Sequence, residues 1–284
     1  MSSVVALLTL SVGMHATWNL LARQVPASCN YLWWGLLAHL LLFGPLGVYG
    51  LSQITGSSQF ILLNSLAAMA LSIYFVALRH AYRFAPAAFV YPLARSSPLL
   101  IVIWTWLLWG QLPSWLASVG IGLSLLGLWL LAMTSSRQAH TAQALPWVGL
   151  AAICTSIYSL CDKLLIQQLP SFAAILGYVS LSYLMAFMVM SLLNWRETRH
   201  WLPACRPNAW LILIGGLCIG SSYALIIQVM NHLDTATAVT FSNAGIVVVS
   251  IISIFVLKEQ EQWSKRLAAA SLISMGLIVL GSSL

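Results

Sequence analysis

The stretch TSSRQAHTAQALP, residues 134–146, divides a chain made largely of apolar segments. The chain has 284 residues, of which 61% are hydrophobic and only 6% are charged, and its mean hydropathy is +0.92. Soluble domains carry about 25% charged residues, so this composition indicates a polytopic membrane protein. Because a spanning helix needs about 20 apolar residues, the chain has room for ten such helices and for no sizeable soluble domain.

The apolar runs on either side of this stretch predict five transmembrane helices in each half of the chain. We expect an all-α polytopic membrane fold with a first five-helix repeat over residues 1–135, a linker over 136–145 and a second repeat over 146–284. The predicted spans are 3–22, 30–52, 59–79, 86–109, 115–134, 146–168, 171–193, 209–230, 235–257 and 265–283.

The two halves show a weak internal similarity. An offset of 148 residues sets Pro86 against Asp234 and Arg95 against Asn243 without a gap. Because each repeat has an odd number of spans, the second repeat would be inverted relative to the first, as in many secondary transporters. A repeat of that kind predicts a pseudo-twofold transport path with a site near the membrane midplane.

The positions of lysine and arginine predict the orientation in the membrane. Loops after even-numbered spans hold none of these residues, whereas loops after odd-numbered spans hold many. The positive-inside rule then places the odd loops in the cytoplasm and both termini on the non-cytoplasmic side of the inner membrane. It also explains the net charge of +7 without a nucleic-acid partner. The basic residues assigned to odd loops are Arg23, Arg79, Arg83, Arg137, Arg196, Arg199, Arg206, Lys258, Lys265 and Arg266.

The sequence resembles the drug/metabolite transporter superfamily, specifically the EamA-type proteins. The stretches that carry the resemblance are HATWNLLAR (15–23), ALRHAYRFAPAAFVYPLARSSPLL (77–100), WLLWGQLPSW (106–115), YSLCDK (158–163) and FVLKEQEQW (255–263). The resemblance implies ten helices in two repeats and transport by alternating access. Relatives move amino acids, sugars, nucleotide-linked metabolites and drugs, so it leaves the substrate open. Gln111 and Lys258 depart from the family pattern, which commonly has Glu and Gly at these helix ends.

Arg95 lies within the fourth predicted span, where a lone cation costs roughly 2.5–3.5 kcal/mol on insertion scales. If that helix starts near Pro86, Arg95 lies roughly 13 Å deep, close to the midplane. We expect its guanidinium to face a water-filled cavity and to bind a carboxylate or phosphate of the substrate. A structural ion pair with Asp162 is the alternative.

Asp162 and Lys163 are adjacent on a helix, about 100° apart, so they point in different directions. Lys163 could therefore extend to the helix end instead of facing the cavity.

Polar residues within the spans define the rest of the expected cavity. His15, Trp18 and Asn19 share one helix face through i, i+3, i+4 spacing, although His15 alone could equally form an ordinary interhelical hydrogen bond. His39 is expected to be a buried packing partner. The expected substrate-binding residues are Arg95, Asp162, Lys163, His15, Trp18, Asn19, Tyr91, Tyr158, Ser242 and Asn243.

The cysteines show no metal-binding or redox spacing, and we interpret them as small, membrane-buried hydrophobic residues. They are Cys29, Cys154, Cys161, Cys205 and Cys218.

These features favour transport over other functions. Three of the five acidic residues, Glu197, Glu259 and Glu261, lie in predicted loops, which leaves little for an enzyme. A channel would show rings of like groups or a filter sequence, and the sequence shows neither.

We therefore expect a monomeric secondary transporter in the lipid bilayer, with no cofactor or metal, that moves a small polar metabolite with an acidic group. An amino acid or related zwitterion is favoured. The alternatives are a drug or organic-cation exporter that uses Asp162, and a non-transporting partner in envelope or lipid biogenesis.

Overall fold

The computed structural model describes residues 2–134, 141–256, 258 and 262–283, and every regular element within them is a helix. Ten segments of the described chain are long and apolar enough to cross a membrane, which confirms the predicted fold class. The elements are α1 (Ser2–Arg23), η1 (Ala27–Cys29), α2 (Tyr31–Leu51), α3 (Ser58–Phe84), α4 (Ala87–Ala94), α5 (Ser97–Trp109), α6 (Trp115–Met133), α7 (Thr141–Leu165), η2 (Ile166–Gln168), α8 (Phe172–Thr198), α9 (Ala209–Val229), α10 (Thr235–Ser242), α11 (Ala244–Phe255) and α12 (Trp263–Gly281).

Several predicted boundaries are wrong at the basic ends of the spans. Helix α3 continues to Phe84, so Arg79 and Arg83 lie in its last turns rather than in a loop. Helix α8 likewise includes Arg196, and α12 includes Lys265 and Arg266. These helices continue past the end of their hydrophobic stretch because the hydrogen bonds of a helix are made by the backbone. A basic or polar side chain therefore does not end the helix.

The predicted linker over 136–145 overlaps a helix. Helix α7 already begins at Thr141, while 136–140, including Arg137, lie outside the described residues, as do Glu259 and Glu261.

The fourth and ninth spans are each interrupted near the middle. The fourth consists of α4 and α5, which are separated at Arg95 and Ser96, and the ninth consists of α10 and α11, which are separated at Asn243. Pro98, the second residue of α5, contributes to the first interruption because it has no backbone N–H and its ring collides with the carbonyl four residues earlier.

At both interruptions a backbone N–H donates to the carbonyl oxygen three residues earlier, instead of four residues earlier as in an α-helix. This pattern is typical of a tighter helical turn. Ser96 N donates to Leu93 O at 3.1 Å, and Asn243 N donates to Thr240 O at 3.0 Å.

The interruptions occur at the positions that the 148-residue offset aligns. Arg95 pairs with Asn243 in that alignment, and both residues lie at breaks. Pro86 pairs with Asp234, and both residues are N-caps, of α4 and α10 respectively. Matching caps and matching breaks support the predicted repeat, and the inverted relation of its two copies stays a prediction.

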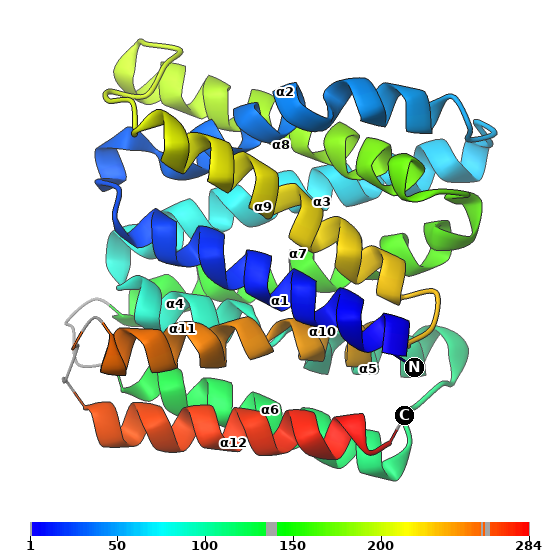
Figure 1. Cartoon of the computed structure of the whole chain (residues 1–284), viewed down its shortest axis with the longest axis vertical. Coiled ribbons are helices and arrows are strands. Elements are labelled where there is room, and N and C mark those ends of the chain that lie inside the picture. Colours follow the sequence, from blue (N-terminus) through cyan, green and yellow to red (C-terminus); the bar gives the residue numbers. More distant parts are fainter. Residues whose placement is uncertain (1, 135–140, 257, 259–261, 284) are drawn as a thin grey trace. The chain divides into compact units, whose positions relative to one another are not determined.

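The chain forms two compact units, and each unit takes helices from both sequence halves. Unit 1 comprises Met1–Phe75 and Cys161–His232, and unit 2 comprises Val76–Leu160 and Leu233–Leu284. In unit 1, α2 packs against α8 and α9, and α1 packs along α9 (Figure 1). In unit 2, α6 and α12 run side by side, and α11 packs against α12.

Small residues allow the closest helix contacts, as is usual in membrane bundles. A Cβ added to Gly50 of α2 would lie 2.0 Å from the carbonyl oxygen of Ala173 in α8, and one added to Gly276 of α12 would lie 2.5 Å from the backbone nitrogen of Ser124 in α6.

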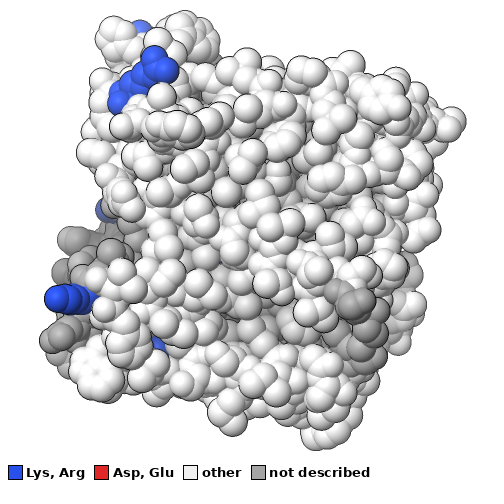
Figure 2. All heavy atoms as spheres, viewed as in Figure 1, with Lys and Arg blue, Asp and Glu red and all other residues white. Residues whose placement is uncertain are grey.

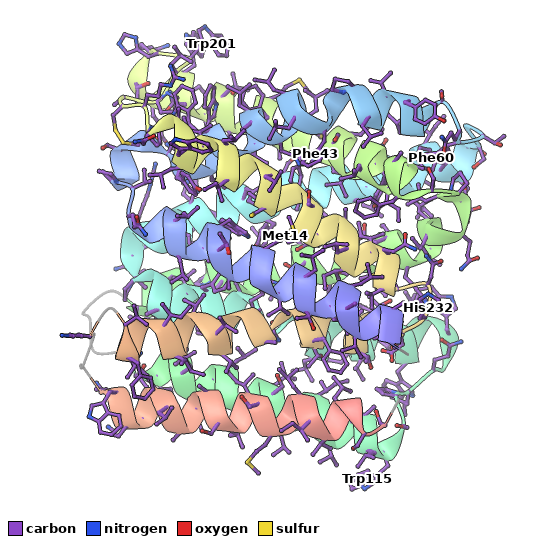
Figure 3. The ribbon with its side chains drawn as sticks, viewed as in Figure 1. Met14, Phe43, Phe60, Trp115, Trp201 and His232 are labelled. Atoms are coloured by element: carbon purple, nitrogen blue, oxygen red, sulfur yellow. A yellow bond between two sulfur atoms is a disulfide. The ribbon has the colours of Figure 1, made fainter. Side chains whose placement is uncertain are left out.

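The surface matches a lipid environment. Nearly all of the face shown in Figure 2 belongs to residues other than Lys, Arg, Asp and Glu. Trp115 and Trp201 lie just at or beyond helix ends and extend outward (Figure 3), with 83% and 58% of their surface exposed. Tryptophan at the ends of spanning helices is typical of the membrane–water interface.

Candidate functional site

Arg95 lies at the interruption of the fourth span and is held by hydroxyl groups of unit 2. Its Nε and Nη2 atoms donate to the Tyr91 hydroxyl at 3.2 and 2.8 Å, and its Nη1 atom donates to Ser242 Oγ at 3.1 Å. Tyr91 is one helical turn earlier on α4, and Ser242 is the last residue of α10. The guanidinium is half-buried. These bonds orient its fork through neutral acceptors.

Asn243 completes the junction between the two interrupted spans. It is fully buried, and its Nδ2 atom lies 3.5 Å from the backbone carbonyl oxygen of Arg95, to which it donates. Its Oδ1 atom and the hydroxyl of the fully buried Ser97 have no hydrogen-bond partner within the described residues. Buried polar groups without partners are rare, and they often mark a place that a ligand or water completes.

The structure thus brings together four of the predicted site residues in unit 2: Arg95, Tyr91, Ser242 and Asn243. Tyr158 belongs to the same unit and is buried on α7.

The predicted polar face of α1 lies in unit 1 and turns toward α9. His15 Nδ1 lies 3.3 Å from Ser222 Oγ, and Trp18 Nε1 donates to the same ring nitrogen at 3.4 Å. Asn19 Nδ2 donates to the carbonyl oxygen of His15 at 2.7 Å. The three residues form one hydrogen-bonded group, as the i, i+3, i+4 spacing predicts.

Asp162 is held in unit 1 by two tyrosines that the sequence analysis did not identify. The Tyr178 hydroxyl of α8 donates to Asp162 Oδ1 at 2.5 Å, and the Tyr223 hydroxyl of α9 donates to Oδ2. Only 1% of the Asp162 surface is exposed. The available signal was the tyrosines of two spans, Tyr178 and Tyr183 in α8 and Tyr223 in α9, but nothing local to them indicates which two point at one carboxylate.

Lys163 has a contact that favours a structural role. Its Nζ donates to the carbonyl oxygen of Met230, the C-cap residue of α9. A cation at a helix C-terminus is favourable because the last carbonyls carry partial negative charge. The neighbouring residues Asp162 and Lys163 therefore point to different partners, as the helix geometry predicts.

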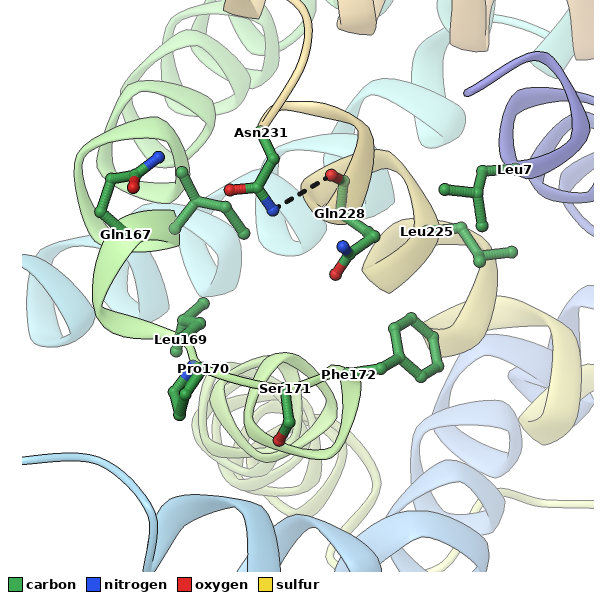
Figure 4. A pocket seen from close by; sticks show the side chains of 10 residues that line it. Leu7, Gln167, Leu169, Pro170, Ser171, Phe172, Leu225, Gln228 and Asn231 are labelled. Carbon is green, nitrogen blue, oxygen red and sulfur yellow. Dashed lines mark hydrogen bonds between the residues drawn. The ribbon is translucent and has the colours of Figure 1, made fainter. Parts of the chain in front are cut away.

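Unit 1 contains a pocket of about 700 Å³ that is lined by residues of α1, η2, α8 and α9 and of the connections beside them (Figure 4). Its polar groups are amides and a hydroxyl, and Asn231 Nδ2 donates to the Gln228 carbonyl oxygen at 3.3 Å. The residues that line it are Leu7, Ile166, Gln167, Leu169, Pro170, Ser171, Phe172, Leu225, Gln228 and Asn231.

The interpretation of the five cysteines as small, membrane-buried hydrophobic residues is wrong for two of them. Cys29 and Cys205 form a disulfide, with Cα atoms 4.5 Å apart. The packing of α1 and α2 against α9 brings the α1–α2 and α8–α9 connections together, which the spacing of 176 residues along the chain could not reveal. Cys154, Cys161 and Cys218 are buried free thiols.

His39 is fully buried on α2, in agreement with a packing role. One ring nitrogen of His39 lies 3.2 Å from Ser180 Oγ, and its ring contacts the rings of Phe43 and Tyr183.

Comparison with known proteins identifies a family domain in the second half of the chain. Residues 143–282 match the EamA-like transporter family. No curated protein sequence matches the chain. A solved structure, described only as a crystal structure of a protein, has the same fold: it is 18% identical, the alignment covers 98% of this chain and 97% of that chain, and the TM-score is 0.71. The chain therefore carries an EamA-like transporter domain, which belongs to the drug/metabolite transporter superfamily, and its ten described spanning helices fit the EamA-type fold.

Proposed function

We propose that this protein is a secondary transporter that moves a small polar metabolite with an acidic group across the inner membrane by alternating access. An amino acid or a related zwitterion is the favoured substrate. The observation that carries the proposal is the position of Arg95 where two interrupted spanning helices of unit 2 meet. Interrupted spans in corresponding positions of two repeats are the usual location of transporter binding sites.

The chemistry of Arg95 favours an anionic group. Its planar guanidinium can form two parallel, charge-assisted hydrogen bonds to a carboxylate or phosphate. Tyr91 and Ser242, which accept hydrogen bonds from Arg95, are neutral and do not cancel its charge. A substrate oxygen could replace either hydroxyl without leaving an ion behind.

Asn243 supports a substrate that also carries an amine. Its Oδ1 atom is a buried acceptor with no partner in the described residues, beside the backbone of Arg95. A substrate ammonium group could donate to it. One unit would then hold the groups for both ends of a zwitterion.

A ligand screen tests the proposal. The thermal stability of purified wild type and of Arg95→Ala would be measured with amino acids, phosphonates, sugar acids and quaternary amines. Binding stabilises by RT ln(1 + [L]/Kd), about 2.7 kcal/mol at one hundred times Kd. We expect an acidic ligand that stabilises wild type and the control Arg83→Ala but not Arg95→Ala. Stabilisation by the same acid in all three proteins would contradict the proposal.

Export of an organic cation at Asp162 is the second candidate. The observation in its favour is a buried carboxylate in a spanning helix, whose hydrogen-bond donors in unit 1 are uncharged. A cationic ligand that still stabilises Arg95→Ala, but not Asp162→Asn, would support this function instead.

A further inference from the structure

Asp162 is a carboxyl group in the interior of a spanning helix. Its two oxygens accept hydrogen bonds from Tyr178 and Tyr223. These bonds stabilise the carboxylate, but the hydroxyl groups carry no opposite charge. An ionised carboxylate within the bilayer is costly unless a cation accompanies it, and carboxyl groups in such positions often serve in proton relays.

The groups around Asp162 occupy both of its oxygens, so a cation larger than a proton would have to displace one of the two tyrosines. Both oxygens are covered by tyrosine hydroxyls, and 1% of the residue is exposed. Helix α7 adds the buried thiol of Cys161 and the ammonium of Lys163, which donates to the Met230 carbonyl oxygen. The other titratable groups that face Asp162 are the phenols of Tyr178 on α8 and Tyr223 on α9. Helix α3 contributes Phe60, whose ring lies 6.5 Å from that of Tyr178.

One of the two tyrosines connects the carboxyl to a less enclosed region. Tyr178 is fully buried, whereas Tyr223 is half-buried. The Tyr223 hydroxyl is therefore the side from which water can reach the carboxyl group. A phenol hydroxyl can exchange hydrogen bonds with water, because it is both a donor and an acceptor.

We propose that Asp162 is a proton-binding site that exchanges with solvent through the Tyr223 hydroxyl. A proton on a water molecule beside Tyr223 transfers to the Tyr223 oxygen while the Tyr223 hydroxyl proton passes to Asp162 Oδ2, which leaves a neutral carboxyl and a neutral phenol. The reverse transfer releases the proton. The proposal rests on the transport function proposed above and assigns protons as its coupling ion, at a site separate from Arg95.

The proposal can be tested without a known substrate. N,N′-dicyclohexylcarbodiimide is an apolar reagent that reacts with protonated carboxyl groups. The full chain in lipid nanodiscs would be treated with it, and the modified peptides would be quantified by mass spectrometry. We expect modification of Asp162 that falls at least about tenfold between about pH 5 and about pH 9, because the reactive fraction falls tenfold for each pH unit above the titration midpoint.

Variants distinguish proton binding from mere burial. Tyr223→Phe removes one hydrogen bond to the carboxylate, so the decline should move to higher pH. Tyr183→Phe is the matched control, because this buried tyrosine of α8 donates to the Ile219 carbonyl oxygen instead, and its profile should equal that of wild type. Asp162→Asn removes the carboxyl group and serves as the control without a reactive group at this position. If that variant fails to fold, Asp162→Glu, which keeps a carboxyl group, takes its place.

Two results would overturn the proposal: no modification of Asp162 at any pH, or modification that does not change over this range. Either result leaves the Arg95 ligand screen unaffected. Conversely, a failed screen beside a pH-dependent Asp162 would count against the acidic substrate and not against the proton site.

Discussion

Arg95 Nη1 donates a hydrogen bond to Ser242 Oγ at 3.1 Å, and this bond joins the interruption of the fourth span to the interruption of the ninth. The two residues are 147 positions apart, one less than the offset that aligns the repeats. The contact therefore links nearly equivalent positions of the two sequence halves within unit 2. A ligand that binds there would contact both halves at once, which is what a site on a pseudo-twofold axis requires.

Arg95→Lys should weaken binding of the acidic ligand while the protein stays folded. Lysine keeps the charge but loses the planar fork, so it cannot bond two hydroxyls and a carboxylate in the same geometry. We expect a loss of about tenfold to a hundredfold in affinity, since a charge-assisted hydrogen bond contributes about 1.5–3 kcal/mol. Calorimetry on the variant measures this, with Arg83→Lys as the control. Unchanged affinity would show that only the charge of Arg95 matters.

Asn243→Ala should separate zwitterions from simple acids. The substitution removes the buried Oδ1 acceptor that has no partner in the described residues, so we expect amino-acid binding to weaken while binding of the matching carboxylate without an amine is retained. The protein's stability should change little, because an unsatisfied buried acceptor is removed together with one long hydrogen bond. Equal losses for both ligands would place the amine elsewhere.

Gly50→Ala should strongly destabilise unit 1. The new Cβ would lie 2.0 Å from the backbone oxygen of Ala173, so α2 and α8 would have to separate. Overpacking typically costs about 1–3 kcal/mol, and a backbone collision can cost more. Gly44→Ala on the same helix is the matched control, since nothing lies within 4 Å of its added Cβ. It should be neutral or stabilising by up to about 1 kcal/mol. Similar thermal unfolding of the two variants would contradict the close α2–α8 packing.

The Cys29–Cys205 pair tests the predicted orientation. Arg199 and Arg206 flank the α8–α9 connection, and the positive-inside rule places this connection in the cytoplasm, where thiols are kept reduced. We therefore expect a membrane-permeant alkylating reagent to label both cysteines in intact cells, and the bond to form after purification in air.

Peptide mass spectrometry with and without reductant measures this labelling, and the buried thiol of Cys218 serves as the internal control. A bond already present in cells would place the basic loops on the oxidising side and reverse the predicted orientation. In purified protein that contains the bond, Cys29→Ser should lower stability by up to about 4–5 kcal/mol, because the bond closes a very long loop.

The sequence by itself determined the spanning segments and the residues that are unusual within them. Hydropathy depends on each segment alone, because a run of about 20 apolar residues partitions into the bilayer whatever its neighbours are. For the same reason Arg95 and Asp162 could be recognised as charges within spanning segments, and the spacing of His15, Trp18 and Asn19 was enough to place them on one face. The 148-residue offset also aligns Arg95 with Asn243, the two positions at which spans are interrupted.

The tertiary structure alone decided which of these residues meet. Tyr178 and Tyr223 converge on Asp162, and Cys205 reaches Cys29, only because particular helices pack side by side. Helix pairing depends on the shapes of facing side chains and on glycine contacts such as Gly50 against Ala173. These contacts are made between segments that are distant in the sequence. An apolar helix surface has nearly the same hydropathy whether it faces lipid or another helix. The sequence of one span therefore does not identify the helix that packs against it.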